Sequence, residues 1–138
     1  MIHRVLRIGR WVLDVLFATE EYDVEGVLSC MYEIDAPYSA MMDSKHLMES
    51  GDMNTGFMYA NPENKRAILC VGPTTSGSEF LDTVVHEVHH FAVVVASELG
   101  IDLESETPAY VLGDTIREIA DIVCRMGCDN CHPRYKID

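Results

Sequence analysis

The chain has 138 residues, of which 23 are acidic and 10 are basic, so its formal net charge at neutral pH is −13. This length suits one domain with a substantial core and is too short for two, so we expect residues 1–138 to form a single domain. Nucleic acids and anionic membranes bind basic surfaces, so the charge excludes both as expected partners. We interpret the charge as a solvated acidic surface.

The N-terminal segment predicts a strand and not an export signal. Arg4, Arg7 and Arg10 precede an apolar run over residues 11–17. Asp14 interrupts that run, however, and no cleavage site with small side chains follows it. No segment reaches the length of a transmembrane helix. We therefore expect a soluble, cytoplasmic protein.

The next elements predict an α+β fold. Asp23 can cap a helix that ends before Pro37, and residues 39–49 predict a second helix. A turn rich in asparagine then separates two short apolar runs, which predicts two strands, 57–60 and 67–71. We expect a small sheet that packs against the helices after it.

A long helix is predicted between Ser76, a good N-cap, and Gly100, a plausible stop. At its centre, His86, Glu87 and His90 form the pattern HExxH. Residues four apart share one face of a helix, so the two imidazoles can bind one zinc ion while Glu87 lies beside them. The pattern therefore predicts a hydrolytic zinc site.

The apolar residues of this helix predict that it is buried. Most of them cluster on the side opposite the histidines: Leu81, Val84, Val85, Val88, Phe91, Ala92, Val95 and Leu99. Val93 and Val94 fall near the histidine side, and a helix that is apolar nearly all round is a buried one. We therefore expect the histidines to face an interior cleft.

A catalytic zinc usually has three protein ligands, so a further carboxylate is needed. Ser105 predicts the N-cap of another helix, whose core face comprises Ala109, Leu112, Ile116, Ile119 and Val123. A short loop between the two helices would bring Glu106 back towards the histidines. We favour Glu106 because it shares a helix stripe with Tyr110. Glu104 is the alternative ligand, and acidic residues also favour the first turn of any helix.

HEVHH at residues 86–90 and ETPAYVLG at residues 106–113 resemble the gluzincin family of zinc metallopeptidases. The likeness is greatest to small single-domain gluzincin-like proteins of phages and prophages, and it covers roughly residues 50–120. It implies a zincin-like domain in which Zn²⁺ is bound by His86, His90 and Glu106, with Glu87 as the general base of peptide hydrolysis. Some larger gluzincins have an aspartate where this chain has Tyr110.

The sequence thus predicts a zinc metallopeptidase that acts on a peptide or protein. Tyr110 is expected to donate a hydrogen bond to the oxyanion of the reaction, with packing on the helix surface as its alternative role. The alternative function is a non-catalytic module that keeps the zincin fold for binding or structure.

The C-terminal cysteines raise the question of a second metal. Cys124, Cys128, Cys131 and His132 are chemically suitable zinc ligands, but their spacing is tight for four ligands at the end of a helix. We expect reduced thiols instead, because five cysteines and no export signal indicate a reducing compartment.

Overall fold

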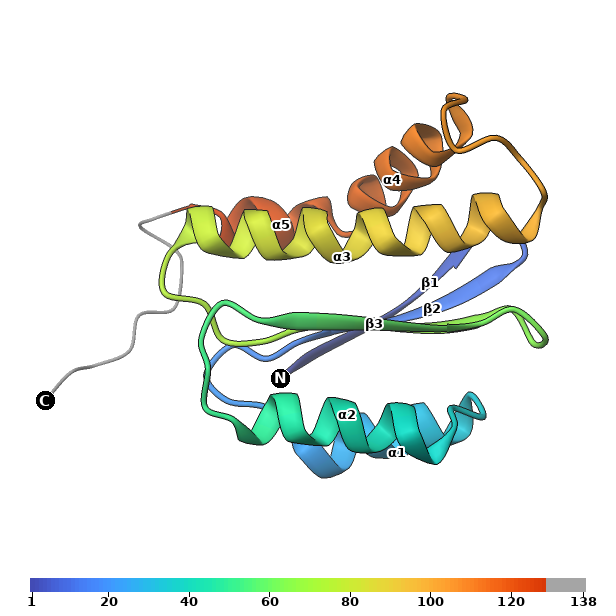
Figure 1. The fold of residues 1–138 in the computed structure, drawn as a ribbon. Helices are drawn as coiled ribbons and strands as arrows, with labels where there is room; N and C mark the ends of the chain where they lie inside the picture. The colour runs from blue at the N-terminus through green and yellow to red at the C-terminus, as the bar shows by residue number, and fades with distance from the viewer. Residues whose placement is uncertain (129–138) are drawn as a thin grey trace, which may run out of the picture.

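The computed structural model describes residues 1–128, and within them four strands form one mixed sheet (Figure 1). The strands are β1 (Ile2–Ile8), β2 (Trp11–Phe17), β3 (Gly56–Asn61) and β4 (Arg66–Val71). β1 and β2 are antiparallel, β2 and β4 are parallel, and β4 and β3 are antiparallel. The order is β1-β2-β4-β3, so β1 and β3 are the two edges.

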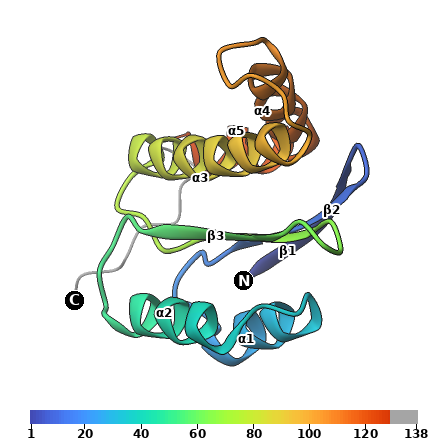
Figure 2. The same ribbon diagram turned by 45° about the vertical axis from the view of Figure 1, so that its right-hand side comes forward.

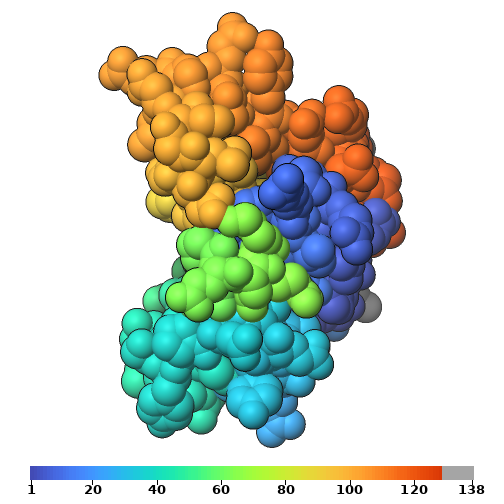
Figure 3. Space-filling model, turned by 90° about the vertical axis from the view of Figure 1, so that its right-hand side faces the viewer, coloured from blue at the N-terminus to red at the C-terminus, as the bar shows by residue number. Residues whose placement is uncertain are grey.

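Helices cover both faces of this sheet. The helices α1 (Val24–Glu33) and α2 (Tyr38–Glu49) lie on one face, and α3 (Gly77–Glu98), α4 (Thr107–Glu118) and α5 (Ala120–Met126) lie on the other (Figures 1 and 2). Figure 3 shows the three layers from one end of the sheet. At this end the turns of the β1–β2 and β3–β4 hairpins lie between α1 and α2 on one side and the segment of α3 and α4 on the other. The expected α+β class is confirmed. Within residues 1–128, every helix is too short or too polar to cross a membrane.

Each face of the sheet has its own apolar core, because successive strand residues point to opposite faces. On β2, Leu13, Val15 and Phe17 point towards α3, whereas Leu16 points towards α1 and α2. Burying one such side chain stabilises the fold by about 1.5–3 kcal/mol. The two cores together fix the sheet between the helical layers.

The helix ends confirm most of the predicted boundaries. The Asp23 carboxylate caps α1 by accepting a hydrogen bond of 3.0 Å from the amide three residues later, and Ser76 caps α3 in the same way at 3.2 Å. Gly100 follows the end of α3 with a φ of 69°, a conformation that suits glycine. The N-terminal segment forms two strands where we expected one, and the chain turns between them at Gly9, whose φ is 60°.

The last predicted helix was wrong in two details. Ser105 is not its cap, since its hydroxyl donates to the carbonyl of Asp102 at 2.6 Å, and Glu106 takes the cap position. The helix also breaks at Ile119, whose φ is −115°, into α4 and α5. Ile119, Ile122 and Met126 lie in the core beneath α3. Ile119 belongs to the predicted core face, whereas Ile122 and Met126 do not.

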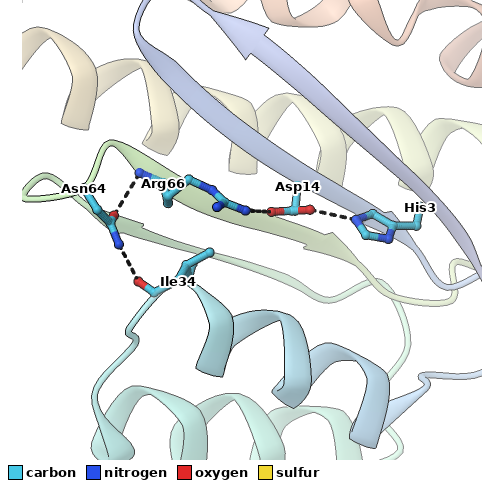
Figure 4. A network of polar contacts seen from close by, with 5 residues as sticks. All are labelled: His3, Asp14, Ile34, Asn64 and Arg66. Carbon is cyan, nitrogen blue, oxygen red and sulfur yellow. Dashed lines mark hydrogen bonds and ion pairs between the residues drawn. The ribbon is translucent and has the colours of Figure 1, made fainter.

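A polar network explains why a charged residue interrupts apolar β2 (Figure 4). Asp14 is only 6% exposed, and its carboxylate lies 2.8 Å from Nε2 of His3 and 3.3 Å from Nη2 of Arg66. Beside Arg66, the amide of Asn64 donates to the carbonyl of Ile34 at 3.1 Å. A buried carboxylate lowers the stability of the fold unless it is paired, and His3 and Arg66 pair with Asp14. The network also joins β1, β2 and β4 to one another and to the end of α1.

Candidate functional site

The apolar side of α3 fixes where its polar residues point. Of the eight apolar residues expected on the core side, five are buried: Val84, Val88, Phe91, Ala92 and Val95. The other three, Leu81, Val85 and Leu99, are exposed, which corrects the expectation. The buried set recurs every three or four residues and packs on the sheet.

The histidines of α3 are exposed, so the expectation that they face an interior cleft is wrong. His86 and His90 each follow a buried valine by two residues, which is about 200° around a helix. Burying Val84 and Val88 therefore turns both imidazoles outward. His89 is exposed as well, with its ring centroid 6.3 Å from that of His90.

His86 and His90 nevertheless point at each other. Their Nε2 atoms lie 3.0 Å apart, and their ring centroids are separated by 4.6 Å with an angle of 79° between the ring planes. Two nitrogens bound to one tetrahedral zinc ion are about 3.3 Å apart, given zinc–nitrogen bonds of about 2.0–2.1 Å. The pair thus has nearly the spacing that two ligands of one zinc require.

Glu87 points in a different direction from the histidines, into the protein. It is 7% exposed and lies against the start of β3, where a Cβ added at Gly56 would be 3.2 Å from its Cγ. Burial raises the pKa of its carboxyl, and the nearby His86 and His90 partly oppose that rise. The carboxyl is therefore buried, yet close enough to both imidazoles to interact with them electrostatically.

Tyr22 is a neighbour of Glu87 that sequence reasoning missed. Its hydroxyl lies 3.0 Å from Oγ1 of Thr55 and donates to the Thr55 carbonyl at 3.2 Å. Burial raises the pKa of Tyr22 to about 12, with a smaller contribution from the charge of Glu87. Its ring fills the space beside Gly72, where an added Cβ would collide with it. Tyr22 therefore fixes Thr55, the residue before Gly56, and no pattern in the sequence links it to α3.

Glu106 and Tyr110 form a second pair, on α4. Both are exposed, and the Tyr110 hydroxyl donates to Oε2 of Glu106 at 2.8 Å. In Figures 1 and 2 the first turn of α4 lies beyond α3 as seen from the sheet. Glu104 is also exposed, and its amide donates to Oδ1 of Asp102 at 2.9 Å.

The structure brings His86 next to His90 and Tyr110 next to Glu106, but it does not bring the two pairs into one group. Among residues 1–128, no three histidine, cysteine, aspartate or glutamate side chains form a group that could hold a metal ion. Glu106 thus does not complete a set of three with His86 and His90 in this arrangement.

The C-terminal cysteines are only partly described. Cys124 is exposed on α5 and is a free thiol, and Cys128 is half-buried just after that helix. Cys131 and His132, the other two residues considered as ligands of a second metal, lie outside the described residues.

No protein-family model, curated protein or solved structure matches this chain.

Proposed function

We propose that the protein is a zinc-dependent metallopeptidase of gluzincin type, built as a minimal zincin-like domain. The observation that carries the proposal is the pair of Nε2 atoms of His86 and His90, 3.0 Å apart, with the buried carboxyl of Glu87 beside them. The sheet, the HExxH helix and a following helix that begins next to Glu106 are compatible with such a domain.

The two imidazoles fit a zinc ion in chemistry and in spacing. Neutral imidazole nitrogens are common zinc ligands, and both are exposed, so a metal ion can reach them from solvent. Zinc, when bound, lowers the pKa of a water molecule and polarises a carbonyl group.

Glu87 is the proposed general base. Its burial raises the pKa of the carboxyl above its ordinary value, which makes the carboxylate a stronger base and moves its pKa towards the working pH, where general acid–base catalysis is most efficient. The Cγ atom of Glu87 lies against Gly56 at the start of β3. Glu87 therefore would take a proton from water and return it to the leaving amine.

Glu106 is the proposed third ligand, on the strength of the resemblance. Its carboxylate is exposed and is held only by the exposed Tyr110 hydroxyl among the contacts of the described residues. Binding to the same zinc would require the first turn of α4 to approach the histidine side of α3. Tyr110 would then reach the site with it, as the proposed donor to the oxyanion.

A peptide or protein is the proposed substrate, and a cytoplasmic location is part of the proposal. Among the described residues, Cys30, Cys70 and Cys124 are free thiols, which suits a reducing compartment.

The deciding experiment compares wild type with Glu87→Gln at matched zinc occupancy on a diverse peptide library. Glutamine keeps the shape of the side chain but cannot accept the proton, so hydrolysis should fall by about a hundredfold or more while zinc content is unchanged. Equal rates in the two proteins, or a zinc-loaded wild type that cleaves nothing, would remove the peptidase proposal.

One observation favours a second candidate, a non-catalytic module with the same fold. Within the described chain, His86 and His90 have no third side chain grouped with them. A zinc site with two protein ligands suits binding between chains better than hydrolysis. Zinc binding without hydrolysis in the experiment above would support this candidate.

A further inference from the structure

The two edges of the sheet differ in a way that bears on what binds there. An exposed strand edge pairs readily with another chain, and proteins usually block it with charged side chains, proline or a bulge. β1 carries His3, Arg4 and Arg7, and Arg4 forms an ion pair with Asp121 of α5. β3 has the sequence GFMYAN, without charge or proline, and its pairing with β4 is continuous. Among residues 1–128, β3 is therefore the sheet edge that these devices leave open to pairing.

The main-chain groups that face this open edge can be identified. The main-chain amide of Val12 donates to the carbonyl of Lys65, and that of Ala18 donates to the carbonyl of Val71. The odd-numbered residues of β4 therefore form their main-chain hydrogen bonds with β2. Even-numbered residues of β4 therefore bond to β3, as Gly72 does to the carbonyl of Thr55 at 2.8 Å. In an antiparallel pair the bonded positions alternate. The amides and carbonyls of Gly56, Met58 and Ala60 thus point outward.

A groove borders the same edge on the face opposite α3. It has a volume of about 270 Å³ and lies between residues 57–59 of β3 and four residues of α2: Ala40, Asp43, Ser44 and Leu47. Met58 also packs towards the core beneath α3. It therefore lines the groove at the strand edge itself, and the groove is open to a chain paired with β3.

Asp43 is the charged residue of this groove. It is exposed, and no ion pair involves it among the contacts of residues 1–128. The rest of the lining is apolar, aromatic or hydroxyl-bearing. Such a groove favours a side chain with an aliphatic stem and a positive end, as lysine has.

We infer that β3 holds its peptide as an added strand, and that the groove between α2 and β3 selects a basic side chain of that peptide through Asp43. The inference rests on the proposed peptidase function for the identity of the ligand. Side chains of an added strand alternate between faces. One set would lie on the α3 side, near Glu87, and the other set would enter the groove.

The test measures binding and not hydrolysis, so that it can fail separately from the proposed function. The test uses the variant Glu87→Gln and two fluorescein-labelled peptides of ten residues. One peptide alternates threonine with lysine, and the other alternates threonine with glutamate. Fluorescence anisotropy measures the affinity of each peptide. The lysine peptide should bind about tenfold more tightly, since repulsion by Asp43 replaces attraction in the glutamate peptide.

Three further variants in the same background isolate the groove and the edge. Asp43→Asn should reduce the preference to about threefold, and Asp43→Lys should reverse it. Ala60→Pro removes one outward amide without touching a bond to β4, so it should weaken both peptides at least fivefold or so. The control Glu118→Gln removes one exposed acidic charge on α4 and should leave the preference at about tenfold.

The outcomes separate clearly. An unchanged preference in Asp43→Asn, or unchanged affinity in a folded Ala60→Pro, would overturn the inference even if peptides are hydrolysed. If Ala60→Pro fails to fold, the two Asp43 variants decide alone. Peptide binding that depends on Asp43, without any hydrolysis by wild type, would keep the groove and remove the peptidase. A dimer that Ala60→Pro converts to monomer would show that a second copy occupies the edge, against the inference.

Discussion

Gly56 on β3 packs directly against Glu87 on α3. A Cβ at this glycine would lie 2.8 Å from the carbonyl oxygen of Cys70, 2.9 Å from Cγ2 of Thr83 and 3.2 Å from Cγ of Glu87. All three distances are shorter than ordinary contacts, and one partner is main chain, which cannot rotate away. The absence of a side chain at position 56 is thus what allows the carboxyl of Glu87 to lie so close to the sheet.

Gly56→Ala should therefore destabilise the protein and displace Glu87. We expect a loss of about 1–3 kcal/mol in the free energy of unfolding, the usual cost of forcing a methyl group into a filled space. Denaturant unfolding measures this loss. Gly113→Ala on α4 is the matched control, since nothing lies within 4 Å of its added Cβ, and alanine there should stabilise the helix by about 0.5–1 kcal/mol. Similar effects in the two variants would contradict the proposed contact.

The fold was largely predictable because its signals are local. The caps Asp23 and Ser76, the stop at Gly100 and the apolar runs of the strands all act within a few residues of the elements they define. The break at Ile119 was not predictable, because residues 106–123 keep one helical period throughout. It depends on how the chain packs beneath α3, which is tertiary information.

The candidate site was predictable only in part. The spacing of His86 and His90 predicted that their nitrogens would meet, and they do, at 3.0 Å. Their exposure was not predicted, because the periodic pattern did not show that Leu81 and Val85 lie outside the core. The groove between α2 and β3 and the contact of Tyr22 with Thr55 join segments distant in the chain, for which a single sequence carries no signal.

Tyr22 should make the protein lose stability at high pH. Its pKa is raised from the ordinary value of about 10 to about 12 in the folded protein. Between these values the unfolded chain releases the proton and the folded protein keeps it. Stability is therefore full below pH of about 10 and falls as the pH rises towards about 12, by about 2 kcal/mol after allowance for partial exposure.

The measurement compares wild type with Tyr22→Phe. The difference between their ultraviolet titrations at the tyrosinate band should have a midpoint near the pKa of about 12. The decline in unfolding free energy above pH of about 10 should be smaller in Tyr22→Phe. A difference titration centred near the ordinary value of about 10 would show that Tyr22 is not buried against Thr55.

The cysteines near the C-terminus should not contribute to the proposed catalytic zinc. Cys124 is exposed on α5, and Cys128 follows the end of that helix. Replacing Cys124, Cys128 and Cys131 together with serine should leave about one zinc ion per chain, as in wild type. Metal analysis of both proteins purified without chelator is the measurement. If wild type holds two equivalents and the triple variant one, the cysteines form a structural site.

The last prediction concerns the third zinc ligand. Two histidines alone bind zinc weakly, so a carboxylate that joins them contributes much of the affinity. Glu106→Gln keeps the size of the side chain but removes its charge, and it should weaken zinc binding by at least about tenfold. Glu104→Gln is the control, with the same change two residues away on the same exposed segment, and it should bind zinc as wild type does.

Competitive titration against a chromophoric chelator measures both affinities, with His86→Ala as the reference for loss of an imidazole. Because zinc that binds only the folded state also stabilises it, the rise in melting temperature on adding zinc should shrink in Glu106→Gln and in His86→Ala, but not in Glu104→Gln. Loss of zinc in Glu104→Gln with retention in Glu106→Gln would make Glu104 the ligand. Retention in both variants, with loss in His86→Ala, would instead leave the histidine pair as a site with two protein ligands, and the non-catalytic module would then be the better account of this domain.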